Sequence, residues 1–278
     1  VLKKSKDGLT PMQKTVLQFL AAAGFVLYSA VVLDLGSDMI LPFTGMTVSI
    51  RIPPWIYYPF LVLVLYFISN SVNLTDGVDG LCGGISIFVL LFFALVAKKI
   101  PNFEYAIIFN AALTGGLLGF LVYNLHPARV FMGDTGSLVV GLILAVLSIN
   151  FIELSFDALP YAFPFRSSPA MAIAILIIPL ADTLRIFAVR MMSGKSPFQA
   201  DRNHIHHQLL DLGLSHREAA LTLYLVNIGF ILTALALRNI SSLLLLYVLI
   251  GLAMVLGTVP FLIRYFNKSK AIDIKAVK

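Results

Sequence analysis

The sequence is poor in charge and almost free of cysteine. Only 12% of its 278 residues are charged, whereas an ordinary soluble domain has about 25%. This shortage excludes a conventional soluble protein, and no stretch has the composition of a separate soluble domain. The single cysteine, Cys82, excludes an internal disulfide. The chain starts at Val1 instead of Met, without a signal-like basic segment, and we therefore expect it to begin inside a longer protein.

Long apolar runs take the place of the missing charges. Hydrophobic residues make up 59% of the chain, and the mean hydropathy is +0.93. Because a bilayer-spanning helix needs about 20 apolar residues, the runs predict an all-α polytopic membrane helical bundle, with eight transmembrane helices in a single integral membrane domain over residues 1–278. The expected spans are Val16–Leu35, Trp55–Val72, Leu81–Ala97, Tyr105–Tyr123, Leu138–Phe156, Met171–Met191, Leu221–Leu237 and Leu243–Arg264.

The lysines and arginines predict how these helices are oriented. With eight spans, the N-terminal segment, the C-terminal tail and the loops near 73–80, 124–137 and 192–220 share one side. That side carries 15 of the 20 Lys and Arg residues. Because cytoplasmic loops of membrane proteins are enriched in these residues, we predict that the C-terminus and all three loops are cytoplasmic.

Those loops also hold the most unusual polar clusters. The first, residues 70–80, reads NSVNLTDGVDG and places two carboxylates, Asp76 and Asp79, between apolar helices. Ionisable groups at membrane depth are rare and usually mark a functional site. The second cluster, residues 124–137, reads NLHPARVFMGDTGS and contains Asp134.

The third cluster is the long loop of residues 194–213, which carries the motif HIHH. We expect a short surface helix over His206–Leu212, stopped by Gly213. The imidazoles of this motif are suited to hydrogen-bond or neutralise phosphate oxygens. They belong to His204, His206 and His207.

The residue types of the three clusters suit a nucleotide and metal site. Carboxylates beside glycine-rich turns suit Mg²⁺, which is commonly held by one or two carboxylates together with substrate phosphates. Asp79 and Asp134 fall near the N-termini of predicted helices, where exposed N–H groups favour anions. Phe131 offers an aromatic face on which a base can stack.

Single residues of these clusters are also compatible with simpler roles. Asp134 alone can serve merely as a helix cap. The HIHH motif is also compatible with zinc, although no cysteine lies nearby and zinc prefers a closed tetrahedral ligand set. Asp182 and Arg185 are spaced i, i+3 within the sixth predicted span, and we favour a purely structural ion pair between them.

Together the motifs NLTDGVDGL, NxxPAxxFMGDTGSL and HxHH resemble those of the polyprenyl-phosphate N-acetylhexosamine-1-phosphate transferases, in glycosyltransferase family 4. The resemblance covers essentially the whole chain and implies a Mg²⁺-dependent enzyme of the bacterial inner membrane. In that reaction a UDP-N-acetylhexosamine gives its sugar-1-phosphate to undecaprenyl phosphate. UMP leaves, and a lipid-linked sugar pyrophosphate forms for cell-envelope synthesis. The implied partners are these two substrates and the lipid bilayer, with a homodimer as an expected assembly and no nucleic acid.

The resemblance also implies roles for the polar residues. It implies Asp134 as the main protein ligand of Mg²⁺, with Asp76 beside it. The implied catalytic residues are Asp76, Asp79, Asp134, His204, His206 and His207. The implied substrate-binding residues are Asn73, Asn124, Phe131 and Arg202, with Phe131 stacking on the uracil.

One family feature is missing from the sequence. Family members carry an Asp-Asp pair at the cytoplasmic end of an earlier helix, where it is thought to act on the acceptor phosphate. Val1–Lys14 resembles the loop that follows this pair. We therefore expect the pair and several N-terminal helices to precede Val1.

Two branches of the family compete. The first cluster and Leu41-Pro42-Phe43 look like the branch that transfers phospho-N-acetylmuramoyl-pentapeptide. The third cluster, in which Ile205 interrupts the histidines, looks like the N-acetylglucosamine-1-phosphate branch, as do residues 196–202 and 212–217. We favour UDP-N-acetylglucosamine as the donor because the histidine loop lies near the sugar end of the substrate.

Two alternatives come from other functional classes. A secondary transporter also places carboxylates and broken helices at mid-membrane, but the sequence has no convincing internal repeat. A non-catalytic lipid-binding paralogue accounts for the missing Asp-Asp pair. The sequence upstream of Val1 would separate such a paralogue from a fragment of an enzyme.

Overall fold

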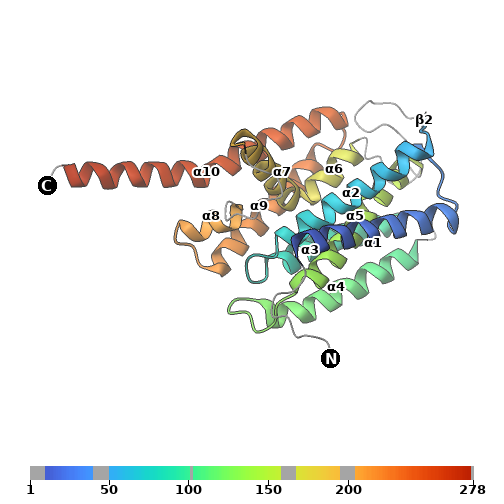
Figure 1. The fold of residues 1–278 in the computed structure, drawn as a ribbon, viewed down its shortest axis with the longest axis horizontal. Helices are drawn as coiled ribbons and strands as arrows, with labels where there is room; N and C mark the ends of the chain where they lie inside the picture. Colours follow the sequence, from blue (N-terminus) through green and yellow to red (C-terminus); the bar gives the residue numbers. More distant parts are fainter. Residues whose placement is uncertain (1–9, 40–49, 101–102, 158–166, 195–203, 277–278) are drawn as a thin grey trace.

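The computed structural model describes residues 10–39, 50–100, 103–157, 167–194 and 204–276. These residues form ten helices and one short antiparallel hairpin, which confirms the predicted all-α bundle (Figure 1). The helices are α1 Pro11–Val31, α2 Pro54–Leu74, α3 Leu81–Ala97, α4 Glu104–Asn124, α5 Gly133–Asp157, α6 Ser168–Ile175, α7 Ile177–Met192, α8 Ile205–Asp211, α9 His216–Ala236 and α10 Ser242–Ala276. The hairpin pairs β1 (Asp38–Met39) with β2 (Ile50–Arg51).

The chain is a polytopic membrane protein. Six of its described helices, α1, α2, α4, α5, α9 and α10, are long and apolar enough to cross a bilayer. The bent pair of α6 and α7 adds a seventh candidate span, and the apolar helix α3 is shorter, with 17 residues. Each of the eight predicted spans therefore corresponds to helix, but two of them differ from a simple full-length span.

The sixth predicted span, Met171–Met191, is not one helix. Instead α6 and α7 meet at Leu176 with a bend of 83°. Pro179 explains the break, because proline has no N–H for the carbonyl four residues earlier and its ring clashes with that carbonyl. This carbonyl, on Ile175, accepts a hydrogen bond from the buried Asn227 side chain of α9 at 3.4 Å. The predicted sixth span is therefore present as two bent helices instead of one straight helix.

Local sequence fixes several helix starts. Both α1 and α9 begin with capping boxes, in which a Thr or Ser and a Gln or Glu three residues later satisfy each other's backbone N–H groups. Helix α3 starts at Gly80, whose φ of +81° lies in the left-handed region that favours glycine. The predicted short helix is confirmed as α8, which begins one residue earlier than expected and is followed by Gly213 at φ +95°.

The arrangement of the helices brings three connections to one end of the bundle. In Figure 1 the α2–α3 turn, the α4–α5 loop and α8 lie at the left, and the hairpin strand β2 lies at the opposite end. The long helix α10 projects past the same end as α8. The prediction that the three polar clusters share one end is thus confirmed. Helix α3, which is the most buried of the long helices, passes through the centre of the core beneath them.

Candidate active site

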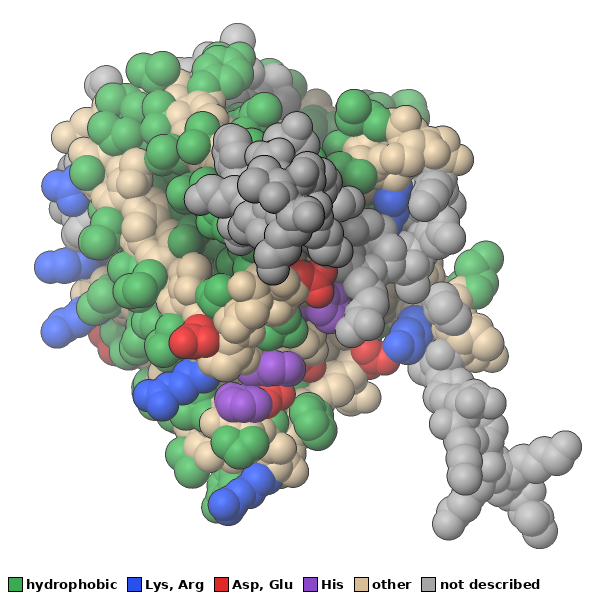
Figure 2. Space-filling view, turned by 90° about the vertical axis from the view of Figure 1, so that its left-hand side faces the viewer, with side chains coloured by type: hydrophobic (Ala, Val, Ile, Leu, Met, Phe, Trp, Pro, Cys, Tyr) green, Lys and Arg blue, Asp and Glu red, His purple; other side chains and the backbone are tan. Residues whose placement is uncertain are grey.

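The polar end of the bundle carries the side chains singled out by the sequence. Figure 2 looks onto this end, where histidine and carboxylate side chains lie close together with lysines and arginines around them. Three clusters make up the site. They centre on Asp134, Asp79 and Asp182, and each joins segments that are far apart in the sequence.

The first cluster joins the end of α2 to the start of α5. The side-chain amide of Asn73 donates to the Asp134 carboxylate at 3.1 Å and to the Ser137 hydroxyl at 2.7 Å. Lys14 of α1 forms an ion pair with the second oxygen of Asp134. Asp134 is thus held by an amide and an ammonium group that come from two different helices.

Asp76 lies next to this cluster in an environment that disfavours its charge. Burial raises the pKa of its carboxyl to about 6, and the nearby charge of Asp134 adds to this effect. The hydrogen bond from the Gly133 backbone N–H acts in the opposite direction. Two carboxylates that face each other in this way attract a cation. The expected proximity of Asp76 and Asp134 is therefore present in the fold.

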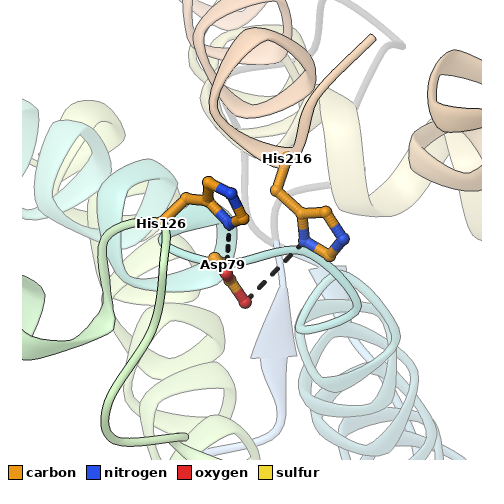
Figure 3. A group of neighbouring side chains, drawn as sticks. All are labelled: Asp79, His126 and His216. Atoms are coloured by element: carbon orange, nitrogen blue, oxygen red, sulfur yellow. Dashed lines mark hydrogen bonds and ion pairs between the residues drawn. The ribbon is translucent and has the colours of Figure 1, made fainter. Parts of the chain in front are cut away.

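The second cluster surrounds Asp79, three residues further along the same turn (Figure 3). The Nδ1–H of His126 donates to one carboxylate oxygen at 2.8 Å, and the Ala128 backbone N–H donates to the same oxygen at 3.2 Å. The Nδ1 atom of His216, at the start of α9, lies 3.7 Å from the other oxygen. Burial opposes ionisation of Asp79, but the two hydrogen bonds and the nearby histidines outweigh it and lower the pKa of this carboxyl.

Asn124 fixes the loop that belongs to this second cluster. Its side-chain oxygen accepts from the Gly80 N–H at 3.0 Å, and its amide donates to the Val130 carbonyl at 2.8 Å. The Tyr224 hydroxyl donates to the Gly80 carbonyl at 2.6 Å. Asn124 is buried, so its position in the structure is that of an anchor between the turn and the loop. The adjacent Phe131 is 73% exposed, with its ring accessible from outside.

The third cluster is built around Asp182 of α7. One carboxylate oxygen accepts from Arg185 at 2.8 Å and from the Ile205 backbone N–H at 2.9 Å. The other oxygen accepts from the Nδ1–H of the buried His204 at 2.8 Å. The predicted Asp182–Arg185 ion pair is confirmed, but a purely structural interpretation of it was incomplete. The same carboxylate also fixes the first histidine of the HIHH motif and the start of α8.

His206 connects the third cluster to the first. A Cβ atom on Gly77 would lie 2.2 Å from its Nε2 atom, so only glycine allows the imidazole to approach the turn this closely. Burial lowers the pKa of His206 to about 4, and the nearby His207 contributes to the shift. His206 is therefore neutral at pH 7, able to hydrogen-bond but not to neutralise a phosphate. Its position places the histidine helix against the α2–α3 turn at Gly77.

The structure thus brings most of the predicted residues together and adds two residues, and one further role of a third residue, that the sequence did not indicate. Arg202 and the motif residues 196–198 lie outside the described residues, as does Leu41-Pro42-Phe43. The additions are His126, His216 and the second role of Asp182. One signal was available, since all five histidines of the chain fall in segments predicted for the same end.

Comparisons with known proteins show to which family the chain is similar. Residues 6–152, more than half of the chain, match the family model described as glycosyl transferase family 4. A phospho-N-acetylmuramoyl-pentapeptide-transferase of Acetivibrio thermocellus is 44% identical over 149 residues, which cover 54% of this chain and 44% of that protein. A probable undecaprenyl-phosphate N-acetylglucosaminyl 1-phosphate transferase of Bacillus subtilis is 35% identical over 215 residues, covering 76% and 57%.

These matches leave part of each relative uncovered, since the chain spans 44% of the first and 57% of the second. A longer match comes from Caldicellulosiruptor bescii, whose phospho-N-acetylmuramoyl-pentapeptide-transferase is 33% identical over 247 residues. That alignment covers 87% of this chain and 69% of the relative. The motifs, the family model and this long alignment lead to one conclusion: the chain belongs to glycosyl transferase family 4.

Proposed function

We propose that this chain belongs to a membrane enzyme that transfers a sugar-1-phosphate from a UDP-sugar to a polyprenyl phosphate. The names of its relatives, which belong to transferases of this kind, support the reaction class. The observation that carries the proposal is that two contacts converge on the α2–α3 turn: the Asp76 carboxyl accepts from the Gly133 N–H beside Asp134, and the His206 imidazole packs against Gly77. These groups come from α2–α3, α5 and α8, and together they line one end of a membrane bundle.

The carboxylates of Asp76 and Asp134 are suited to hold a magnesium ion. Asp134 and Asp76 would hold Mg²⁺, with the Asn73 amide keeping Asp134 in place. Two observations support the fit: the raised pKa of Asp76, which a cation would lower again, and the attraction of Lys14 to Asp134. When bound, Mg²⁺ would supply positive charge against the phosphates of the donor, and neutralising such charge is the main demand of phosphoryl transfer.

The neighbouring residues would orient the donor. Neutral His206 has an Nε2 atom beside the turn and is placed to hydrogen-bond a phosphate or sugar oxygen. His204, held by Asp182, has a fixed ring orientation because its Nδ1–H is engaged. Phe131 presents an exposed ring for the uracil, while Asn124 and Asp79 hold the loop that carries it.

The bundle end with these residues faces the cytoplasm in our proposal. The excess of Lys and Arg in the segments on this side supports that orientation. A UDP-sugar would then arrive from the cytoplasm, while the polyprenyl phosphate reaches the same end from within the bilayer. Cysteine substitutions near Asp134 should react with a membrane-impermeant reagent only from the cytoplasmic side. Labelling from the outside would contradict the orientation.

We further propose that the donor is UDP-N-acetylglucosamine and that the product serves cell-envelope polysaccharide or teichoic acid synthesis. The interrupted histidine motif supports this choice, because it resembles that of the N-acetylglucosamine-1-phosphate branch. Ile205, which interrupts the histidines, donates its backbone N–H to Asp182 and packs its side chain against the core. The second candidate is a phospho-N-acetylmuramoyl-pentapeptide transferase. The relatives with that name, including the one that is 44% identical, favour it.

A donor competition with the purified full-length protein decides between the two. The protein is supplied with Mg²⁺, undecaprenyl phosphate and either UDP-N-acetylglucosamine or UDP-N-acetylmuramoyl-pentapeptide. We expect lipid-linked product and UMP only from the first donor, and no product from an Asp134→Asn control. Turnover of the pentapeptide donor alone would assign the chain to the other branch. Turnover of neither, in a folded protein, would contradict the transferase proposal.

A further inference from the structure

The carboxylate of Asp79 and the two imidazoles around it are of the residue types that bind metal ions. Three potential ligand atoms, from Asp79, His126 and His216, lie within 4.8 Å of one another. They come from the α2–α3 turn, the α4–α5 loop and the first residue of α9, which are 47 and 90 positions apart in the sequence. Figure 3 shows both imidazoles directed at the same carboxylate.

The distances suit a bound ion. The Nδ1 atom of His126 is 2.8 Å from one oxygen of Asp79, and that of His216 is 3.7 Å from the other. In a tetrahedral site with metal–ligand bonds of about 2.1 Å, neighbouring ligand atoms are about 3.4 Å apart. The two observed separations lie on either side of this value, so small side-chain rotations would complete the set.

One atom of the cluster has no hydrogen bond to any described residue. The Nδ1 atom of His216 is inaccessible to solvent and has no hydrogen bond within the described structure. It nevertheless points toward Asp79 from a ring that stacks on His126, with centroids 5.2 Å apart and planes at 17°. An inaccessible polar atom without a bond is costly, and a shared metal ion would satisfy it.

We propose that Asp79, His126 and His216 form a binding site for a divalent transition metal ion of the Zn²⁺ type. Two imidazole nitrogens and one carboxylate oxygen suit Zn²⁺ or Co²⁺, whereas Mg²⁺ prefers oxygen ligands. Three protein ligands leave a fourth position for water or a ligand group. The site is separate from the carboxylates of Asp76 and Asp134, and it does not depend on the proposed transferase function.

The HIHH motif is a weaker candidate for such an ion. The carboxylate closest to it, Asp182, already accepts three hydrogen bonds, from Arg185, Ile205 and His204. The Nδ1 atom of His204 is engaged in one of these bonds. Asp79, by contrast, has one oxygen that accepts no hydrogen bond shorter than 3.5 Å from a described residue. The transition metal therefore belongs with Asp79.

A metal ion bound to Asp79, His126 and His216 would connect three segments of the site. The ion would tie the α2–α3 turn and the start of α9 to the α4–α5 loop, which carries Phe131 beyond His126. Because a neutral imidazole binds a metal through its nitrogen without a proton, the proton on Nδ1 of His126 would have to move to Nε2. Metal binding is expected to order the loop.

A Co²⁺ titration of the untagged, metal-free full-length protein tests the site without substrates. Co²⁺ accepts the same ligands as Zn²⁺, and its visible d–d absorption reports coordination by nitrogen and oxygen. We expect a saturable absorption band that Zn²⁺ abolishes and a large excess of Mg²⁺ does not. Absence of a saturable band, or displacement by Mg²⁺, would overturn the proposal.

Phenylalanine substitutions locate the bound ion. His126→Phe and His216→Phe keep an aromatic ring in the stacked pair but remove the ligand nitrogen. Each should weaken Co²⁺ binding by at least about tenfold, since even the loss of an outer-shell partner costs about 10–100-fold in affinity. The matched control, His207→Phe, removes an imidazole from the HIHH motif and should leave the Kd unchanged.

The opposite pattern would place the ion elsewhere. If His207→Phe abolishes binding while His126→Phe and His216→Phe retain it, the metal binds the HIHH motif and our assignment is wrong. Thermal unfolding of each variant shows whether it remains folded. Asp79→Asn provides a ligand variant of nearly unchanged shape, and it should also weaken Co²⁺ binding. These measurements need no transferase activity, so a failed donor assay leaves them interpretable.

Discussion

Asp76 and Asp79 lie on the same turn, three residues apart, yet their surroundings shift the pKa values of the two carboxyl groups in opposite directions. Asp76 is pushed toward its neutral form by burial and by Asp134, and its pKa rises to about 6. Asp79 is held in its charged form by hydrogen bonds from His126 and Ala128, and its pKa falls. The sequence places two equivalent carboxylates here, whereas the packed helices give them different chemistry.

This difference teaches how one turn can serve two purposes. A carboxylate that lacks a positive partner and faces a second carboxylate is suited to receive a hard cation. A carboxylate that already binds imidazoles is suited to organise a loop or to share a softer metal with them. Pairs of acidic groups with divergent pKa values commonly mark different roles within one site.

The largest expected effect concerns the carboxylates of the first cluster. Asp134→Asn and Asp76→Asn in the full-length protein should lower transfer of N-acetylglucosamine-1-phosphate to undecaprenyl phosphate by about 10²–10³-fold, the loss typical of removing a group that stabilises developing charge. Asp79→Asn should mainly raise the KM for the donor, by about tenfold or more, because a hydrogen bond to a charged group contributes about 1.5–3 kcal/mol.

Asp38→Asn makes the same chemical change at the hairpin end, where Asp38 pairs with the exposed Arg51, and should retain full activity. The proposed difference in role between Asp76 and Asp79 is wrong if Asp79→Asn and Asp76→Asn lower kcat equally. Activity of Asp134→Asn within a few-fold of the unmodified protein would contradict the metal assignment.

A smaller effect is expected at Gly77, which separates the two carboxylates. Gly77→Ala would place a Cβ atom against the imidazole of His206 and force α8 away from the turn. A displacement of catalytic groups by about 1 Å can cost about 10²-fold in rate, so we expect kcat to fall by about tenfold to 10²-fold. Gly229→Ala, in a part of α9 where nothing lies within 4 Å of the new methyl group, is the control. Equal kcat values for the two variants would show that close contact with His206 is unnecessary.

The smallest effect concerns stability as a function of pH. The folded-state pKa of Asp76 is raised from 3.8 to about 6, so its stabilising contribution is present below its unfolded pKa and is lost as pH rises through about 6. Without divalent ions, Asp76→Asn should therefore raise the Tm, and it should raise it more at about pH 8 than at about pH 5. Added Mg²⁺ should abolish the advantage of this variant at the higher pH.

Substitution of Asp79 should change the Tm in the opposite direction. Its pKa is lowered, so its contribution is present above its ordinary pKa and is lost only as pH falls through the lowered value. Asp79→Asn should accordingly lower the Tm at both pH values. A Tm increase for Asp79→Asn at the higher pH, or a decrease for Asp76→Asn, would contradict the assignment of these two environments.

Much of the architecture could be predicted because its determinants are local. Apolar runs predicted the helices, and the bounds of Leu81–Ala97 agree with α3. The glycine at position 213 predicted the end of α8 because few other residues adopt its backbone conformation. At Met171–Met191 the apolar run predicted helix but not its bend of 83°, since a proline reveals that a helix can bend but not by how much. The Ile175 carbonyl at this bend accepts a hydrogen bond from Asn227, which lies on another helix.

The candidate site could be predicted only in part. The motifs predicted that Asp76, Asp134 and the HIHH histidines lie at one end of the bundle, and the fold brings them there. Nothing in the spacing indicated that Asp79 would contact His126 and His216, or that Asp182 would hold His204. Side-chain partners of this kind depend on the packing of whole helices, which local patterns do not specify.

The sequence by itself determined a polytopic membrane bundle, its family and the end at which its polar residues gather. Each of these follows from properties that act along one segment: hydrophobic length, capping residues and short motifs. The tertiary structure alone decided that Asp76 is driven toward its neutral form while Asp79 stays charged. The reason is that burial, neighbouring charges and hydrogen-bond partners are set by α4, α5, α8 and α9 together, and none of these contacts is encoded within the turn itself.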